Sequence, residues 1–187
     1  MATALLDVAR QLVERAKKAG AREAEAYVER SRSASVTVRQ GEIEELSEAA
    51  SKGVGLRVVE GGRLGFASTT DFSEDGLSAL VSRAVALARA AAADKANGLP
   101  EAKLTQGPYA SIADLFDPAV EALEPAWKLR TALAVEEAAK AEDARCSNFE
   151  GSGAGDEVSE VAIANTHGLA QSERGTSVYL WCSPVAQ

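Results

Sequence analysis

Two runs of alternating apolar and polar residues flank a Gly-Gly pair, and they constrain the fold more than any other part of the sequence. Gly53–Val59 precedes the pair, Gly61-Gly62 lies at the centre, and Leu64–Ser68 follows. A period of two places apolar side chains on one face of a strand. Glycine at both central positions favours the positive φ angles of a two-residue hairpin turn. The sequence therefore predicts a β-hairpin and an antiparallel sheet.

The rest of the chain changes between helical and extended patterns. Apolar residues at three- and four-residue steps predict long helices, and runs with a period of two predict further strands. Helices are expected at Thr3–Ala19, with Thr3 as its cap and Gly20 at its end, from Asp71 to about Ala93, and at Pro125–Glu142. Strands are expected at Glu23–Val28, Ala34–Arg39, Arg145–Glu150, Glu157–Asn165 and Ser172–Ser183, with a tight turn at Gln40-Gly41.

The order of elements is similar at the two ends of the chain. A helix, a short turn and three strands describe residues 3–59, and the same order describes residues 125–185. We expect an α+β fold: a curved antiparallel sheet with helices packed on one face, made of two similar helix-plus-three-strand halves. The alternative is that any helix followed by three strands shows this order. The expected divisions are a first half over 1–93, an irregular connection over 94–118 and a second half over 119–187.

The last strand carries large apolar side chains on both faces. Tyr179 and Trp181 alternate with Val178 and Leu180. Strands with two apolar faces are buried on both, so each face is expected to be covered. We expect a C-terminal domain beyond the present sequence to supply the missing cover, which makes the second half truncated. The alternative is that a partner chain supplies it.

The composition disfavours several classes of function. The formal net charge is −8, with 28 acidic and 20 basic residues, which disfavours binding to nucleic acid. No stretch approaches the roughly 18 apolar residues that a membrane span needs, and the N-terminus lacks the pattern of a signal peptide. Two cysteines in 187 residues indicate a reducing compartment. We expect a cytoplasmic protein that binds neither nucleic acid nor membrane.

Catalytic chemistry has few candidate residues. A hydrolytic zinc site needs about three ligands, but the chain has one histidine, His167, in an expected turn, and two distant cysteines, Cys146 and Cys182. Ser152 stands in Glu150–Gly155, a glycine-rich stretch that does not match a nucleophile elbow. We interpret this stretch as a flexible connection between strands. We expect no catalytic residue and no metal site in this chain.

Carboxylates are concentrated beside the predicted tight turn, at Glu42, Glu44, Glu45 and Glu48. A carboxylate pair that performs acid–base chemistry needs burial to separate its pKa values. These residues lie at a hairpin edge, so we interpret them as a solvated face.

Five segments, in this order, resemble one protein family. They are Ala21–Glu42, Gly53–Val59, Gly61–Ser73, Asp114–Pro118 and Val161–Gly168. Together they resemble the N-terminal region of the TldD/PmbA family, which is also called modulator of DNA gyrase. The Ser-Arg-Ser and Gly-Arg-Leu-Gly-Phe-Ala-Ser-Thr sequences within them are closer to the PmbA (TldE) side of the family.

The resemblance implies a cytoplasmic zinc metallopeptidase made of two unlike subunits, which trims the leader from a microcin precursor and degrades an antitoxin. It also implies that the zinc motif, H-E-x-x-x-H, belongs to the TldD-type subunit. The present sequence contains no such motif. No catalytic or metal residue of the family therefore carries over, and zinc is expected only on a TldD-like partner.

We therefore expect a non-catalytic domain that helps a metallopeptidase complex to hold an unfolded peptide. A peptide can add to an exposed strand edge through main-chain hydrogen bonds, and the Val54–Ser68 hairpin is the expected surface. The candidate contact residues are Arg57, Arg63, Tyr179 and Trp181. The alternative is a stand-alone interaction module that forms a homodimer. A hydrolase that uses Ser152 and His167 is a third hypothesis.

Overall fold

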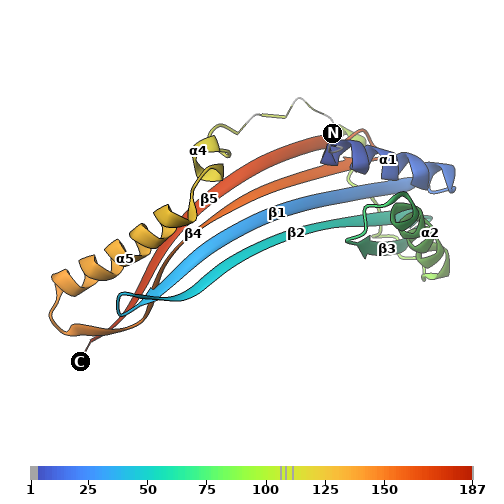
Figure 1. Ribbon diagram of the computed structural model, residues 1–187. Coiled ribbons are helices and arrows are strands. Elements are labelled where there is room, and N and C mark those ends of the chain that lie inside the picture. Colours follow the sequence, from blue (N-terminus) through green and yellow to red (C-terminus); the bar gives the residue numbers. More distant parts are fainter. Residues whose placement is uncertain (1–3, 106, 108, 111, 187) are drawn as a thin grey trace. The chain divides into compact units, whose positions relative to one another are not determined.

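The computed structural model describes residues 4–105, 107, 109–110 and 112–186. Its sheet has five antiparallel strands in the order β3-β2-β1-β4-β5 (Figure 1). The strands are β1 (Glu23–Arg39), β2 (Glu42–Glu60), β3 (Arg63–Thr69), β4 (Cys146–Asn165) and β5 (Ala170–Ala186), and the helices are α1 (Leu5–Lys18), α2 (Glu74–Ala90), α3 (Ala102–Thr105), α4 (Pro118–Glu121) and α5 (Pro125–Glu142). The predicted α+β class is confirmed. No described helix combines the length and the apolar character needed to cross a membrane.

Contacts between residues divide the chain into two units. Unit 1 consists of Met1–Arg30, Lys52–Ile112 and Glu160–Glu173, and unit 2 consists of Ser31–Ser51, Ala113–Ser159 and Arg174–Gln187. Each of the four long strands contributes residues to both units. The predicted division was into consecutive halves of the sequence. The contacts instead group segments from both ends of the chain into each unit.

In unit 1, α1 and α2 cover one face of the sheet. Alternate residues of the strands point into this layer and are buried, as the period of two predicts. The residues of this core include Ala24, Ala26 and Val28 from β1, Val54, Leu56 and Val58 from β2, Leu12 and Ala16 from α1, and Leu80 and Ala84 from α2. On the opposite face, Tyr27 and Phe66 are 44% and 57% exposed.

In unit 2, α5 covers one face of the strands. Val36 and Val38 from β1 and Ala154 from β4 are buried against Ala132 of this helix. Partly buried side chains of the helix surround this small core, namely Trp127, Leu129 and Leu133. Pro125 is the first residue of α5, where its missing N–H costs no helical hydrogen bond, and this prediction is confirmed.

The predicted tight turns are present. Gly61 and Gly62 have φ angles of 58° and 76°, and Gln40 and Gly41 have φ angles of 54° and 81°. Two successive positive φ angles twist a two-residue loop in the same sense as the strands that it joins. The β2–β3 register runs from Glu60↔Arg63 to Val54↔Thr69, so the predicted hairpin is confirmed.

The ends of α1 and α2 can be compared with the predicted capping residues. Gly20, with a φ angle of 98°, ends α1, and its N–H donates to the Lys17 carbonyl at 3.0 Å. The predicted cap, Thr3, lies outside the described residues. Helix α2 is capped by Ser73, whose Oγ accepts a hydrogen bond from the Gly76 N–H at 3.1 Å. The predicted first residue, Asp71, instead accepts a hydrogen bond from the Ser73 N–H, and the backbone and side-chain hydrogen bonds from Ser73 lower the pKa of its carboxyl.

The strands are longer than the sequence predicts. The expected strands at Glu23–Val28 and Ala34–Arg39 are parts of β1. The expected strand at Arg145–Glu150 begins one residue later, at Cys146, and it and the expected strand at Glu157–Asn165 are parts of β4. The prediction of a flexible connection at Glu150–Gly155 is wrong, because this stretch is strand and Gly151 to Asp156 are buried. The similar order at the two ends of the chain persists as α1-β1-β2 and α5-β4-β5, with two long strands in place of three short ones.

Gly65 of β3 is the closest point between the sheet and α2. A Cβ atom at this position would overlap the Ala84 carbonyl oxygen and the Ala88 backbone nitrogen. Because both are backbone atoms of a helix, they cannot move aside without shifting the helix.

Gly65→Ala is therefore expected to destabilise the fold by about 2–3 kcal/mol, measured by urea unfolding. Gly53→Ala is the matched control: its Cβ would lie 3.8 Å from Glu29, and an unchanged or slightly raised stability is expected. Equal effects of the two substitutions would contradict the close contact.

Candidate peptide-contact surfaces

A shallow groove with a volume of about 750 Å³ lies on the face of unit 1 that α1 and α2 leave uncovered. Its floor is backbone, because β2 places Gly53 and Gly55 there. Phe66 of β3 lies close to Gly55, where a Cβ atom would be 3.0 Å from the aromatic ring. Tyr27 of β1 also lines the groove. Two exposed aromatic rings above a backbone floor suit contact with an extended chain better than enclosure of a small ligand.

Polar groups line the rest of the groove. The residues are Glu29, Lys52, Ser68, Thr69 and Thr70. Partial burial and then the neighbouring Glu29 carboxylate raise the pKa of the Tyr27 hydroxyl above its usual value of 10.0. Lys52 extends over the ring of Phe72, with its Nζ 5.1 Å from the ring centroid.

The two predicted arginine contacts lie in unit 1 and have partners within it. Arg57 of β2 donates to the Glu25 carboxylate of β1 at 2.6 Å, and its side chain is 37% exposed. Arg63 of β3 donates to the carbonyl oxygens of Arg89 and Ala91 at the end of α2. A cation at this end satisfies carbonyls that lack helical partners. Both residues have a stabilising role, and their contact with a peptide remains a prediction.

The two predicted aromatic contacts lie over a row of glycines in unit 2. Gly151, Gly153 and Gly155 occupy alternate positions of β4, so they share one face. A Cβ atom at Gly153 would overlap Trp181, and one at Gly155 would overlap Tyr179. The rings therefore lie directly against the backbone of β4. This pairing was not among the predicted features, although the matching spacings, Gly151-x-Gly153-x-Gly155 and Tyr179-x-Trp181, contain the signal.

The expected cover of β5 is absent within the described residues. The exposed fractions are 41% for Val178, 46% for Tyr179, 52% for Leu180 and 40% for Trp181. Apolar residues on both faces of this strand are therefore accessible in the described chain, and cover by a C-terminal domain or a partner chain stays a prediction. An accessible apolar strand of this kind is typical of a surface that contacts another protein.

Ser152 and His167 lack the surroundings of a hydrolytic pair. Ser152 is fully buried, and its Oγ lies 3.0 Å from the Cys182 sulfur in a hydrogen bond whose donor can be either atom. His167 lies in the turn between β4 and β5, where its Nδ1 is 2.7 Å from the Pro100 carbonyl and its Nε2 is 3.3 Å from the Glu23 carboxylate. The described residues contain no group of three His, Cys, Asp or Glu side chains that could hold a metal ion.

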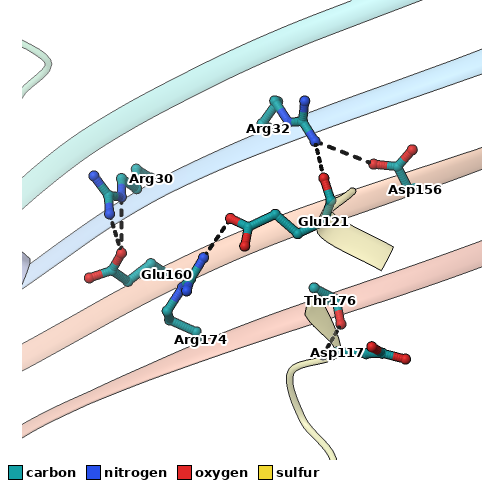
Figure 2. A network of polar contacts seen from close by, with 8 residues as sticks. All are labelled: Arg30, Arg32, Asp117, Glu121, Asp156, Glu160, Arg174 and Thr176. Carbon is teal, nitrogen blue, oxygen red and sulfur yellow. Dashed lines mark hydrogen bonds and ion pairs between the residues drawn. The ribbon is translucent and has the colours of Figure 1, made fainter. Parts of the chain in front are cut away.

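Unit 2 contains a buried ion pair that the sequence did not reveal. Lys128 of α5 and Asp156 of β4 form an ion pair with side chains that are 3% and 0% exposed. Arg32 of β1 lies 4.0 Å from the same carboxylate (Figure 2). Neither Asp156 oxygen receives a hydrogen bond of ordinary geometry from the described residues, so charge compensation holds this carboxylate. The Lys128 ammonium also donates to the Leu123 carbonyl at 3.2 Å.

Arginines of the strands fix α4 against the sheet in unit 2. Figure 2 shows Arg32 pointing to the Glu121 carbonyl and Arg174 pointing to the Glu121 carboxylate, at 3.2 and 2.6 Å. The Asp117 N–H at the start of α4 donates to Thr176 of β5 at 2.9 Å. These contacts tie the segment before α5 to β1 and β5. In unit 1, Arg30 forms a comparable pair with Glu160 at 2.5 Å.

Solved structures share the fold of this chain. Its α+β structure is similar to TldE from Thermococcus kodakarensis, with a TM-score of 0.82 and 21% identity over 95% of this chain and 39% of that one. It is also similar to a Bacteroides thetaiotaomicron protein named as a candidate modulator of DNA gyrase, with a TM-score of 0.85 and 23% identity over 97% of this chain and 41% of that one.

Sequence comparison identifies the family. Residues 24–88 match PmbA/TldA metallopeptidase domain 1, and residues 118–187 match the PmbA/TldA metallopeptidase central domain. The chain is 32% identical to the Metalloprotease PmbA homolog of Haemophilus influenzae over 173 residues and 30% identical to Metalloprotease PmbA of Escherichia coli O157:H7 over 164 residues. The chain belongs to the PmbA/TldD family, and the predicted resemblance to its PmbA side is confirmed.

The chain spans less than two-fifths of the two PmbA proteins that it matches. The alignments cover 92% and 88% of this chain but 38% and 36% of the two PmbA proteins. The two matched domains correspond to β1–α2 and to α4–β5.

The position of Trp181 is expected to depend on the absence of a side chain at residue 153. Gly153→Ala would place a methyl group where the indole lies, so the ring must move away from β4. We expect a shift of the Trp181 fluorescence emission and a loss of about 1–3 kcal/mol in stability, measured in a Trp127→Phe background. Gly175→Ala is the control, since its Cβ would lie 3.4 Å from Ser159. An unchanged emission in the Gly153 variant would contradict the stacked arrangement.

The Lys128–Asp156 pair is expected to be strongly coupled. Lys128→Met leaves a fully buried carboxylate without its main counter-charge, so a loss of about 3–5 kcal/mol is expected. The double variant Lys128→Met/Asp156→Leu is expected to lose much less than the sum of the single losses, because it removes both charges. Urea unfolding measures Lys128→Met, Asp156→Leu and the double variant. Lys103→Met, in an exposed pair with Glu101, is the control with no expected change. Additive single losses would refute the coupling.

Proposed function

We propose that this chain is the non-catalytic N-terminal and central part of a cytoplasmic, PmbA-like metallopeptidase subunit, and that it holds an extended polypeptide. Support for the peptidase context comes from the two relatives, which are named metalloproteases. Support for a role without chemistry comes from the surroundings of Ser152 and His167.

The observation that carries the proposal is the groove in unit 1. Gly53 and Gly55 leave the backbone of β2 accessible, and Tyr27 and Phe66 offer aromatic surface on either side. An extended peptide presents alternating side chains and main-chain groups, so it can contact both features at once. Aromatic stacking and contact with a glycine backbone depend little on sequence, which suits a subunit that handles unfolded peptides.

The proposal assigns the hydrolytic metal to another chain. A TldD-like partner is proposed to supply zinc, and the present chain is proposed to supply contacts to the peptide. In an acyl-transfer reaction that uses zinc, the metal polarises the peptide carbonyl and activates water. Holding the peptide in an extended form next to such a site would lower the entropic cost of reaching the transition state.

Peptide binding tests the groove directly. A labelled, uncharged ten-residue peptide of Ser, Thr, Gln and Leu is expected to bind the purified chain in a fluorescence anisotropy titration. Phe66→Ala is expected to weaken binding about tenfold, because an aromatic contact is lost. Leu87→Ala, at an exposed apolar position of α2 outside the groove, is the matched control. Equal binding by the wild-type protein and the Phe66 variant would exclude the groove as the peptide site.

Co-purification tests the proposed partner. The chain is expected to associate with a zinc-loaded TldD-type subunit and to leave zinc and peptide cleavage with that subunit. Stoichiometric zinc and unaided cleavage by the present chain would overturn the division of roles. The exposed faces of β5 favour one alternative, a stand-alone module that dimerises through this strand. A tight homodimer in sedimentation experiments, indifferent to the TldD-type subunit, would support that alternative.

A further inference from the structure

We propose that the Glu42–Ser51 segment of β2 is an interaction surface for an extended polypeptide strand that carries lysine or arginine side chains. The segment belongs to unit 2, whereas the groove described above belongs to unit 1. The proposal therefore goes beyond the peptide-holding role of the groove and does not depend on it.

The segment has an open main-chain edge. Strand β3 pairs with β2 only from Glu60 to Val54, where Thr69 is the last partner. Among the described strands, the neighbours of β2 are β3 and β1, so the side of Glu42–Ser51 that faces away from β1 has no strand beside it. At such an edge, every second residue presents its N–H and C=O groups outward. A further strand can add there through main-chain hydrogen bonds.

Both faces of the segment are also uncovered. All ten of its residues are exposed. Ile43 is 49% exposed and Leu46 is 65% exposed, and the period of two places these side chains on opposite faces of the strand. A strand that docked at the edge would bring its own side chains next to both. Main-chain pairing and apolar contact would therefore act together.

The negative charge of the segment favours a partner strand with basic side chains. It contains Glu42, Glu44, Glu45 and Glu48 and no basic residue. Glu44 lies 3.7 Å from Arg39, and the other three form no ion pair with any described residue. Side chains opposite each other on paired strands have Cβ atoms about 4.5–5.5 Å apart. Lysine or arginine on the added strand would meet these carboxylates, whereas acidic residues would be repelled.

The same charges disfavour a second copy of the chain as the occupant. If two copies paired antiparallel about Leu46, Glu44 of each would face Glu48 of the other. Like charges that face each other across a strand pair are destabilising, and each chain has a net charge of −8. The carboxylates therefore protect the edge from self-association while they leave it open to a cationic strand.

Binding of a designed peptide tests the surface. A labelled ten-residue peptide of alternating Lys and Val is expected to bind the purified chain saturably in fluorescence anisotropy at low ionic strength, and the matching Glu-Val peptide is expected not to bind. Glu45→Lys/Glu48→Lys is expected to weaken binding of the Lys-Val peptide at least about tenfold. The matched control, Glu137→Lys/Glu142→Lys, makes the same charge change at two exposed positions of α5 and is expected to stay within about twofold of wild type.

Backbone methylation of the peptide separates strand addition from simple charge attraction. A Lys-Val peptide with every second nitrogen methylated keeps its charge but cannot form the main-chain bonds, so at least about tenfold weaker binding is expected. Because this comparison changes only the peptide, its result does not depend on whether a protein variant folds. Equal binding of the methylated peptide, equal losses in both double variants, or no saturable binding up to about 1 mM would each overturn the proposal. Binding of the uncharged peptide to the groove is measured independently, through Phe66→Ala.

Discussion

The structure depends on the geometry of extended backbone, in which successive side chains point to opposite faces. A helix layer can cover only one of these faces, so the residues of each strand divide into a packed set and an accessible set. In unit 1, Val28 is fully buried while its neighbour Tyr27 is 44% exposed. In unit 2, Val36 and Val38 are buried on the face that α5 covers, and Trp181 lies on the other. The surfaces available for binding are therefore a direct consequence of the pattern that builds the core.

Charged residues at the helix–sheet junction of unit 2 add specificity to apolar packing. Lys128 reaches from α5 to the buried Asp156 of the sheet. Glu136, on the same helix, accepts hydrogen bonds from the Gly41 N–H at 3.0 Å and from Lys140 at 2.6 Å. Burial of such charged groups costs free energy, and their mutual attraction offsets this cost only when the helix and the strands are positioned so that the opposite charges meet. Because the apolar core of this unit is small, these two anchor points determine where α5 lies along the strands.

The sequence predicted the features that follow from local periodicity. The α+β class, the Gly61-Gly62 hairpin, the Gly20 helix end and the start of α5 at Pro125 all arise from patterns within a few residues. The family resemblance required longer segments, but it still depended only on residues in order. Each of these features can be read without knowing which distant segments meet.

The remaining features depend on contacts between distant residues. Gly151 to Gly155 were interpreted as a flexible connection, because glycine normally weakens a strand. The aromatic rings of β5 supply the packing that these glycines lack, and nothing local to β4 reveals it. Arg57 and Arg63 are similar cases. The sequence shows two cationic side chains, but it does not show that Arg57 is paired with Glu25 and that Arg63 donates to a carbonyl at the end of α2. Contacts between residues that are far apart in the sequence leave the weakest signal in local residue patterns.

The anchoring of Arg63 at the end of α2 has a consequence for how the chain folds. The Asp94 N–H and the Asn97 side chain both donate to the Gly62 carbonyl, at 2.9 and 3.0 Å, so the hairpin turn is tied at two neighbouring points to the segment that follows α2. The contacts of Arg63 with Ala91 and of Gly62 with Asn97 join residues only 28 and 35 positions apart, so the entropy lost in closing these loops is small. The β2–β3–α2 segment can therefore assemble before β1 finds β4, and it offers the rest of the sheet a preformed template on which slower, long-range pairing proceeds.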